Sequence, residues 1–305
     1  KSSNKKKKIT TLNKKKRKPT FVLVIPRFED IFHSYYAGEI IRGVSLSASR
    51  LRADYLIHIV DRGEHKGWLD SSLMDRQFID GIIFADIDND ISVVKQAIKR
   101  GMPCMVLNNV LDEPINYVAV DNLQAAHTVV NFFCSQGHSE IATIAGDVST
   151  QAGLKRLEGF REALAEQGIK TPRSYVTFGD FLRTPARAAA KKLLSLKKRP
   201  TAIFAASDVM ALELCYVAQS MNIRIPDDLS VIGFDDNPLI QSSSYPLTTV
   251  SQPLLEMGRI GAEKLFQITR GKLKLPFKEI LPTQLIQRKT TKKVKADGKR
   301  QSKNR

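Results

Sequence analysis

Acidic, amide, basic and aromatic residues gather in short segments that directly follow apolar runs of the sequence. These segments are Arg27 to Tyr36, Asp86 to Asp90, Asn108 to Asn109, Asp121 to Asn122, Asp147 to Arg156, Gly179 to Phe181, Ser207 to Asp208 and Asp235 to Asn237. Carboxylates, amides and guanidinium groups supply hydrogen-bond acceptors and donors, and an aromatic ring can lie against the C–H face of a sugar. This mixture favours binding of a polyhydroxylated small molecule.

The motifs of several common enzyme classes are missing. The segment after the first apolar run, residues 27–30, has no glycine-rich phosphate loop, and the sequence contains neither Gly-x-Ser-x-Gly nor His-Glu-x-x-His. None of the five histidines, His33, His58, His65, His127 and His138, is spaced with cysteines or acids as metal ligands are. We therefore expect no enzymatic activity, no cofactor and no metal ion.

The elements that must position these segments alternate regularly. Nine apolar runs, many of them β-branched, are predicted as strands at residues 21–26, 55–60, 81–85, 104–108, 117–120, 141–145, 175–178, 202–206 and 230–234. Amphipathic stretches between and after them predict helices near residues 35–52, 90–100, 122–136, 150–167, 185–197, 207–221 and 254–270. This alternation is typical of an α/β fold with parallel sheets and helices on both faces.

Nine strands are many for one twisted sheet, so two sheets in two lobes are expected. Ligands of open parallel sheets bind beyond the carboxyl ends of the strands, which is where the polar segments lie. The sequence thus predicts a ligand site in the cleft that two such lobes would form.

The formal net charge of +17 is carried by the two ends of the chain. Residues 1–20 hold ten Lys and Arg without an acid, and residues 288–305 hold nine Lys and Arg against one Asp. The remaining residues 21–287 therefore carry a net charge of −1. The terminal segments are too polar to bury a core, so both are predicted to be disordered tails attached to a near-neutral body.

The three cysteines, Cys104, Cys134 and Cys215, lie far apart in apolar stretches and are predicted to be buried and reduced. No secretory signal is visible, and no apolar run approaches the roughly 18 to 20 residues that span a bilayer. A cytoplasmic location is expected.

Several segments resemble the lactose/galactose repressor (LacI/GalR) family of transcription regulators. The resemblance covers roughly residues 20–291. The matching segments are Ile225-Pro226-Asp227-Asp228-Leu229-Ser230-Val231-Ile232-Gly233-Phe234-Asp235-Asp236, Tyr245 to Val250, Gln136 to Ala142, Arg156 to Phe160, Ala205 to Leu212 and Leu281 to Arg288. It implies a two-lobed fold like that of periplasmic sugar-binding proteins, with three crossovers near residues 134, 253 and 281. The expected N-terminal lobe is 20–133 with 254–281, the C-terminal lobe is 134–253 with 282–291, and 292–305 is a tail.

The resemblance also implies a ligand site. Asp235 would accept hydrogen bonds from ligand hydroxyls, Arg156 would donate through its planar guanidinium, and Phe181 would lie against the ligand face. Asp121 and Ser207 match further polar positions, although the family more often has Asn at the latter.

The first of the polar segments departs from the family pattern, since it has His33-Ser34-Tyr35-Tyr36 where Asn-Pro-Phe-Phe is usual. His33, Tyr35 and Tyr36 are nevertheless predicted ligand-binding residues, implied by the same resemblance.

Each assignment has a structural alternative. Asp235 could cap a turn, Arg156 could be a solvated helix residue, and Phe181 could belong to the core. Asp121 could be the N-cap of the helix that begins near residue 122, and the two tyrosines could simply pack the first helix.

The family resemblance implies a sugar or sugar derivative as effector, a homodimer, and operator DNA bound through a helix-turn-helix domain. Residues 1–20 show no helical periodicity, so we expect that domain not to be part of this chain: either it lies upstream or the protein has none. A periplasmic sugar-binding protein of a transporter is the alternative function, and an α/β enzyme is a third class.

Overall fold

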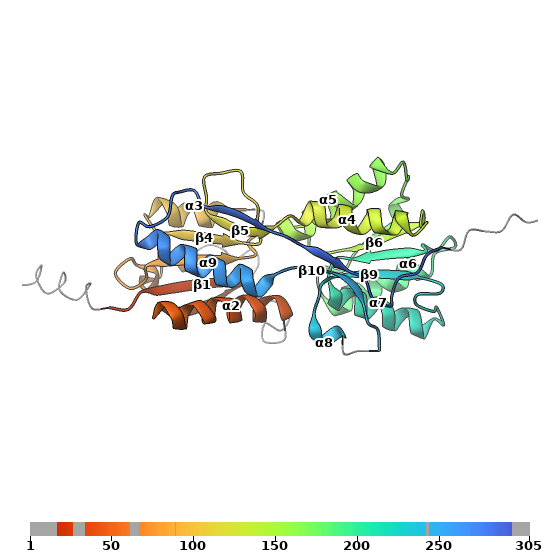
Figure 1. The fold of residues 1–305 in the computed structure, drawn as a ribbon, viewed down its shortest axis with the longest axis horizontal. Coiled ribbons are helices and arrows are strands. Elements are labelled where there is room, and N and C mark those ends of the chain that lie inside the picture. Colours follow the sequence, from red (N-terminus) through yellow and green to blue (C-terminus); the bar gives the residue numbers. More distant parts are fainter. Residues whose placement is uncertain (1–16, 27–33, 62–66, 89, 242–243, 295–305) are drawn as a thin grey trace, which may run out of the picture. The chain divides into compact units, whose positions relative to one another are not determined.

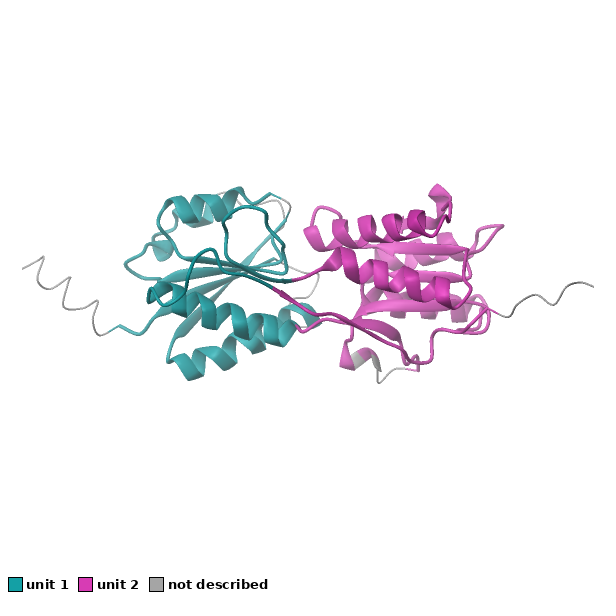
Figure 2. Cartoon of the chain, turned by 45° about the horizontal axis from the view of Figure 1, so that its top comes forward, with its two compact units in different colours: residues 1–119, 254–279 teal, residues 120–253, 280–305 magenta. Residues whose placement is uncertain are grey.

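The computed structural model describes residues 17–26, 34–61, 67–88, 90–241 and 244–294, which fall into two compact units (Figure 2). Unit 1 comprises residues 1–119 and 254–279, and unit 2 comprises residues 120–253 and 280–305. Each unit holds one six-stranded, mostly parallel sheet with helices packed on it (Figure 1). The predicted α/β class with two sheets is confirmed.

In unit 1 the strand order is β11-β5-β4-β3-β1-β2, with β1 pairing in parallel with β2 and β3. The strands are β1 (Thr20–Pro26), β2 (Asp54–Val60), β3 (Gly81–Ala85), β4 (Cys104–Leu107), β5 (Tyr117–Val120) and β11 (Lys278–Leu281), and the helices are α2 (Tyr35–Leu51), α3 (Ser92–Lys99), α9 (Leu254–Thr269) and the short η1 (Trp68–Asp70) and η2 (Ser72–Met74). Strands β1, β3 and β4 are buried almost throughout, as expected for strands covered on both faces.

In unit 2 the strand order is β12-β10-β9-β8-β6-β7. Strand β12 runs antiparallel to β10, and the other neighbouring strands pair in parallel. The strands are β6 (Ile141–Ala145), β7 (Val176–Phe178), β8 (Ala202–Ala205), β9 (Ser230–Asp235), β10 (Thr248–Ser251) and β12 (Gln284–Ile286), and the helices are α4 (Asn122–Ser135), α5 (Gln151–Glu166), η3 (Arg173–Tyr175), α6 (Arg183–Leu194), α7 (Asp208–Ser220) and α8 (Pro238–Gln241).

Two apolar clusters cover the faces of the unit 2 sheet. One joins the sheet to α6 and α7 and includes Leu193, Met210 and Leu214, and the other joins it to α4 and α5 and includes Phe133 and Phe160.

Because strands β6 to β10 are parallel, they all end at one side of the sheet, which we call the carboxyl edge, and they all begin at the opposite side, the amino edge.

The boundaries of the units differ from those expected from the resemblance. Helix α4 was placed in the first lobe, whereas the structure assigns residues 120–133 to unit 2. The reason is packing, because α4 lies against α5 and shares its apolar cluster. The last boundary falls after residue 279 rather than 281.

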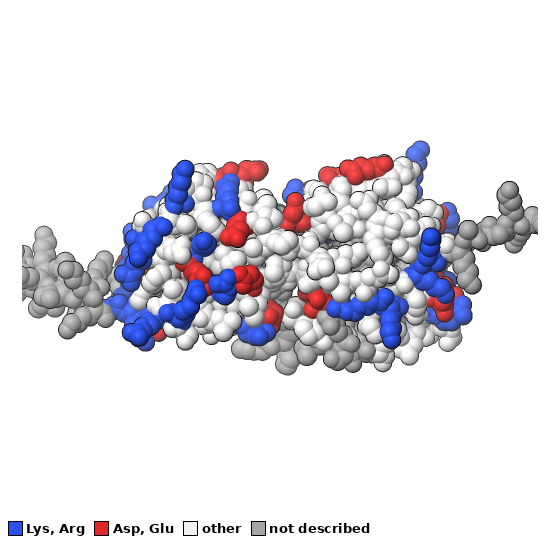
Figure 3. All heavy atoms as spheres, viewed as in Figure 1, with Lys and Arg blue, Asp and Glu red and all other residues white. Residues whose placement is uncertain are grey.

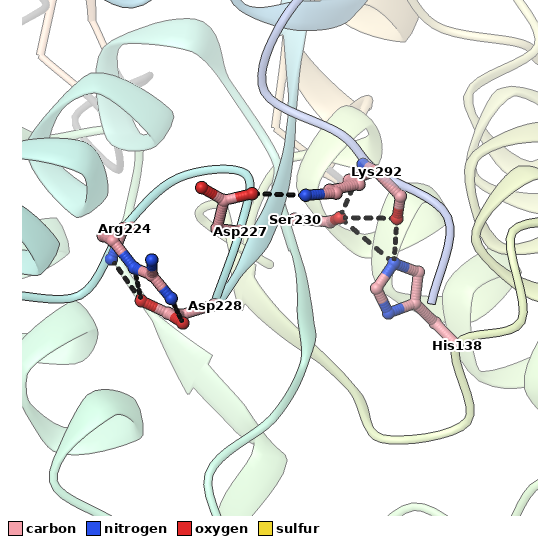
Figure 4. A network of polar contacts seen from close by, with 6 residues as sticks. All are labelled: His138, Arg224, Asp227, Asp228, Ser230 and Lys292. Atoms are coloured by element: carbon pink, nitrogen blue, oxygen red, sulfur yellow. Dashed lines mark hydrogen bonds and ion pairs between the residues drawn. The ribbon is translucent and has the colours of Figure 1, made fainter. Parts of the chain in front are cut away.

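The chain following β12 is fastened to the amino edge of unit 2 (Figure 4). Lys292 N–H donates to Ser230 Oγ at 3.1 Å, its carbonyl lies 3.1 Å from His138 Nε2, and its ammonium pairs with Asp227. Lys292 was expected to begin a disordered tail, but these contacts hold it on the sheet. Residues 17–20 were also expected to be disordered, but Arg17 pairs with Asp80 at 3.0 Å and Thr20 begins β1. Residues 1–16 and 295–305 of the two predicted tails lie outside the described residues.

The cysteine prediction was correct for Cys104 and Cys215, which are buried, and wrong for Cys134, which is half-buried near the end of α4. All three are free thiols.

On the face drawn in Figure 3, basic and acidic side chains are interspersed, in keeping with the near-neutral charge of residues 21–287. Among the described residues, no helix has the length and apolarity that crossing a membrane requires.

Candidate functional site

Arg156 is buried at the carboxyl edge of unit 2, with 3% of its surface exposed. It lies in the second turn of α5, whose N-cap Thr150 accepts a hydrogen bond from Gly153 N–H. Its Nε donates to Asn122 Oδ1 at 2.8 Å and its Nη1 donates to the Ala206 carbonyl at 2.7 Å. The solvated-helix alternative for Arg156 is therefore wrong. These bonds fix a planar cation at the edge of the sheet.

Two aromatic rings adjoin this guanidinium group. Its Cζ lies 3.5 Å from the centre of the Phe234 ring and 5.8 Å from that of Phe181, distances at which a cation and a ring attract each other. Phe181 follows β7 with a φ of 61°, a backbone conformation that is rare for an aromatic residue.

The Phe181 ring rests on the backbone of Gly146, immediately after β6. A Cβ atom at Gly146 would lie 2.0 Å from Phe181 Cζ, so only glycine leaves room for the ring. Phe181 is partly buried, packs against the apolar cluster of α6 and α7, and also adjoins Arg156. Phe181 thus packs against the core and also lies beside the predicted site.

Asp235 ends β9 with a φ of 121°, and its Oδ1 accepts a hydrogen bond from Gln252 Nε2 at 2.6 Å. Gln252 follows β10 and is 4% exposed, and its Oε1 has no hydrogen-bond partner in the described part of the chain. A buried amide oxygen without a donor is costly, and a ligand hydroxyl could supply one. The next residue, Asp236, accepts from Arg288 Nη2 at 2.6 Å.

Asp121 and Ser207 are both helix N-caps. Asp121 accepts from Gln124 N–H at 2.9 Å at the start of α4, and Ser207 accepts from Met210 N–H at 3.3 Å at the start of α7. The capping alternative for Asp121 is thus what the structure shows, and Asp121 is exposed whereas Ser207 is buried.

The remaining predicted residues belong to unit 1. Tyr35 and Tyr36 are the first two residues of α2, which Ser34 caps by accepting from Ala37 N–H. Both are partly buried, and His33 lies outside the described residues. At the carboxyl end of β4, Asn108 and Asn109 have buried Oδ1 atoms without a partner among the described residues, so this edge also offers hydrogen-bond acceptors.

Sequence reasoning missed Gln252 because it missed the strand before it. The segment Thr248–Ser251 is short and mostly polar, a pattern that does not predict a strand, so nothing in the sequence places Gln252 at the end of one. Asn122 was noted only as a polar residue, since nothing in the sequence indicates that it pairs with Arg156. No cluster of three His, Cys, Asp or Glu side chains that could hold a metal ion occurs among the described residues.

A family model described as a periplasmic binding protein-like domain matches residues 130–291. The regulator DegA of Bacillus subtilis is 33% identical over 282 residues, which cover 90% of this chain and 82% of DegA. The repressor CytR of Escherichia coli is 35% identical over 258 residues, covering 81% of this chain and 71% of CytR. This chain belongs to the LacI/GalR family of transcription regulators.

A solved complex of the regulator CelR with cellobiose is similar in fold to this LacI/GalR chain as well. It has a TM-score of 0.82 at 30% identity, and the match covers 90% of this chain and 85% of CelR. The resemblance read from the sequence is thus confirmed. The relatives are transcription regulators rather than enzymes, and they do not favour the alternative of a transport protein.

Proposed function

We propose that this LacI/GalR chain binds a small sugar-like effector at the carboxyl edge of unit 2, and that effector binding controls attachment to operator DNA. The observations that carry the proposal lie at this edge: the buried Arg156 guanidinium group with the Phe181 ring beside it, and the partly buried Asp235 carboxylate bonded to the buried Gln252 amide. The relatives DegA, CytR and CelR are HTH-type regulators by name, which supports DNA as the second partner, bound through a helix-turn-helix domain.

Each side chain has a role that its surroundings allow. The Asp235 carboxylate would accept bonds from ligand hydroxyls, and Gln252 Oε1 would accept another. Arg156 would present its fixed guanidinium to ring or hydroxyl oxygens, and Phe181 would cover a C–H face of the ligand. The other residues implied by the family resemblance stay predictions: Asp121, Ser207, His33, Tyr35 and Tyr36.

Effector binding can control DNA only if the effector prefers one conformation of the regulator over another. Driving the regulator from 1:99 to 99:1 requires a preference of about ten-thousand-fold. A site built from a rigid, buried cation and a shaped backbone suits such discrimination, because a ligand that is slightly misplaced leaves buried groups unpaired.

The proposal is tested by thermal shift followed by calorimetry with a panel of neutral mono- and disaccharides. Cellobiose belongs in the panel because CelR is solved in complex with it. A sugar at one hundred times its dissociation constant should raise the free energy of unfolding by about 2.7 kcal/mol. Asp227→Ala, at the amino edge of the same unit, is the matched control and should bind the sugar like the wild type. No response to any sugar in the panel would contradict a sugar effector.

We also propose that the chain forms a homodimer. Three large apolar side chains of unit 1 are exposed on α2 and β2, namely Leu46, Leu56 and Ile57, which supports a covered surface in the assembly. Symmetric dimers are the commonest oligomers. Sedimentation at micromolar concentration should give a dimer, and a monomer alone would contradict the proposal.

A further inference from the structure

Asp208, the first residue of α7, lies at the carboxyl edge of unit 2. It is buried, with 1% of its surface exposed. Its two oxygens have different partners. Oδ2 accepts a hydrogen bond from the backbone N–H of Asn237 at 2.8 Å, and Oδ1 lies 2.6 Å from Thr249 Oγ1 on β10. One side chain from α7 thus joins β10 to the segment that follows β9.

The sheet leaves space for this side chain at Gly233. A Cβ atom at Gly233, two residues before the end of β9, would lie 2.2 Å from Asp208 Oδ1. Glycine at this position therefore lets the Asp208 carboxyl group reach across β9. Thr249 is itself fully buried, so both ends of the bridge are shielded from water.

The segment held by Asp208 has an unusual backbone. Asp235 has a φ of 121° and Asp236 has a φ of 58°, and residues other than glycine rarely adopt either value. Such a conformation persists only where the surroundings impose it. The buried N–H of Asn237 comes directly after these two residues, and Asp208 is the acceptor that fixes it.

We propose that Asp208 is a positioning residue of the effector site, holding the Asp235–Asn237 segment in the conformation that presents the Asp235 carboxylate. This inference rests on the proposed function, because it gives Asp235 a ligand to meet. Asp208 itself acts through the backbone of Asn237 and through Thr249.

Because Asp208 can gain or lose a proton, its hold on the Asp235–Asn237 segment is sensitive to pH. Burial, and then the negative charge of Asp235, raise the pKa of Asp208 to about 8, against the lowering effect of its bonds to Thr249 and Asn237 N–H. Asp236, whose carboxylate is paired with Arg288, contributes a smaller repulsion. At neutral pH Asp208 is therefore mostly a neutral acid. The Thr249 hydroxyl donates to the ionised Oδ1; when Oδ1 carries the proton, that hydroxyl becomes the acceptor, and Oδ2 still accepts from Asn237 N–H.

Effector binding and this proton are linked. A sugar on Asp235 displaces water, which strengthens the repulsion between the two carboxylates and favours the neutral acid further. Because linkage is reciprocal, the sugar binds more weakly once Asp208 ionises. We expect affinity to fall several-fold between pH 7 and pH 9.

The test compares Asp208→Asn, Asp208→Ala and the wild type, with Asp228→Asn at the amino edge as the control. The asparagine amide reproduces the neutral acid, since its oxygen can accept from Asn237 N–H and its NH₂ can donate to Thr249. Calorimetry with the sugar that the panel identifies should show affinity within about threefold of wild type at pH 7 for Asp208→Asn, without the fall by pH 9. Asp208→Ala should lose at least tenfold in affinity, because it removes the carboxyl oxygen that accepts from Asn237 N–H and so releases the hold on the Asp235–Asn237 segment.

A second measurement needs no sugar. In ¹⁵N-TROSY spectra of the full chain, the amide of Asn237 should titrate with a midpoint near pH 8 in the wild type and in Asp228→Asn, but not in Asp208→Asn. If the wild type binds none of the sugars, the proposed function fails, and the Asn237 titration still decides the contact with Asp208. The inference is overturned if Asp208→Ala binds as well as the wild type or if the Asn237 amide titrates equally in Asp208→Asn.

Discussion

The two edges of the unit 2 sheet both contain buried polar side chains, but they use them differently. At the amino edge, His138 Nδ1 lies 2.9 Å from Thr201 Oγ1, and Nε2 lies near both Ser230 Oγ and the Lys292 carbonyl (Figure 4). A carbonyl only accepts hydrogen bonds, so Nε2 carries the proton and Nδ1 accepts from Thr201. Each ring nitrogen is thus satisfied by the protein itself.

The backbone at the two edges differs in the same sense. At the amino edge, left-handed φ values occur after helices, at Gly137, Gly168 and Asn222, where such residues are the usual way to end a helix. At the carboxyl edge they occur after strands and fall on Asp180, Phe181, Asp235 and Asp236. These conformations, and the Gln252 oxygen that has no hydrogen-bond partner among the described residues, support the effector site proposed at the carboxyl edge. At the amino edge the polar side chains of His138 and its partners stabilise the fold.

The largest effect is expected for Arg156→Ala, because it removes a cation on which both stability and binding depend. Asn122 Oδ1 and the Ala206 carbonyl would lose buried donors, so the free energy of unfolding should fall by roughly 3 kcal/mol. Affinity for the effector should fall by about 2 kcal/mol or more. Urea unfolding and calorimetry measure the two effects, and unchanged values of both would contradict the assignment of Arg156.

Asp235→Ala should separate the two properties. The affinity should fall by about 2 kcal/mol, since ligand hydroxyls lose their acceptor in a desolvated site. The free energy of unfolding should change far less, because Asp235 is only partly buried. Calorimetry and urea unfolding on the same sample provide the comparison, with Asp227→Ala as the control. A variant that loses stability but keeps its affinity would make Asp235 a structural cap.

His138→Gln should affect stability without affecting binding. Burial lowers the pKa of His138, so the unfolded chain binds more protons than the folded chain below about pH 6.5. The stability contributed by neutral His138 is therefore present above pH 6.5 and lost as the pH falls. Wild type should lose more stability than His138→Gln between pH 7 and pH 5. Asp208 acts with the opposite sign between about pH 4 and pH 8 and is unchanged in the variant.

At neutral pH, the same substitution should lower the free energy of unfolding by about 1 to 3 kcal/mol, because it disturbs buried hydrogen bonds. Affinity for the effector should be that of the wild type. A reduced affinity in His138→Gln would show that the amino edge is not purely structural, and the comparison between the edges would fail.

The sequence predicted the helices well because amphipathic periodicity is a local signal. All seven predicted helices are present, with ends within three residues of those expected. Strands β10, β11 and β12 were missed, since β10 is mostly polar in sequence and β11 and β12 are short, with four and three residues. The assignment of α4 to the first lobe was wrong, because the sequence of a helix does not show which neighbouring helix it packs against.

The site was predictable as a set of residue types but not as a set of contacts. Asp208 reads in the sequence as an ordinary acid at the start of a helix, which is the favourable end for a negative charge. Its burial depends on Gly233 and Thr249, which lie 25 and 41 residues further along the chain, and sequence patterns carry no such long-range pairing.

The smallest effect is expected for Phe181→Leu. Leucine keeps an apolar side chain against the cluster of α6 and α7, but it lacks the ring that lies 5.8 Å from the Arg156 guanidinium and that would cover the sugar. Cation–ring attraction is worth about 0.5 to 1 kcal/mol at partly exposed positions, so affinity should fall by roughly twofold to fivefold. Calorimetry with the identified sugar measures this change. Phe178→Leu, three residues earlier and exposed at the end of β7, is the matched control and should leave affinity unchanged. Equal affinities in the wild type and in Phe181→Leu would assign Phe181 to the core alone and restrict the site to Arg156, Asp235 and Gln252.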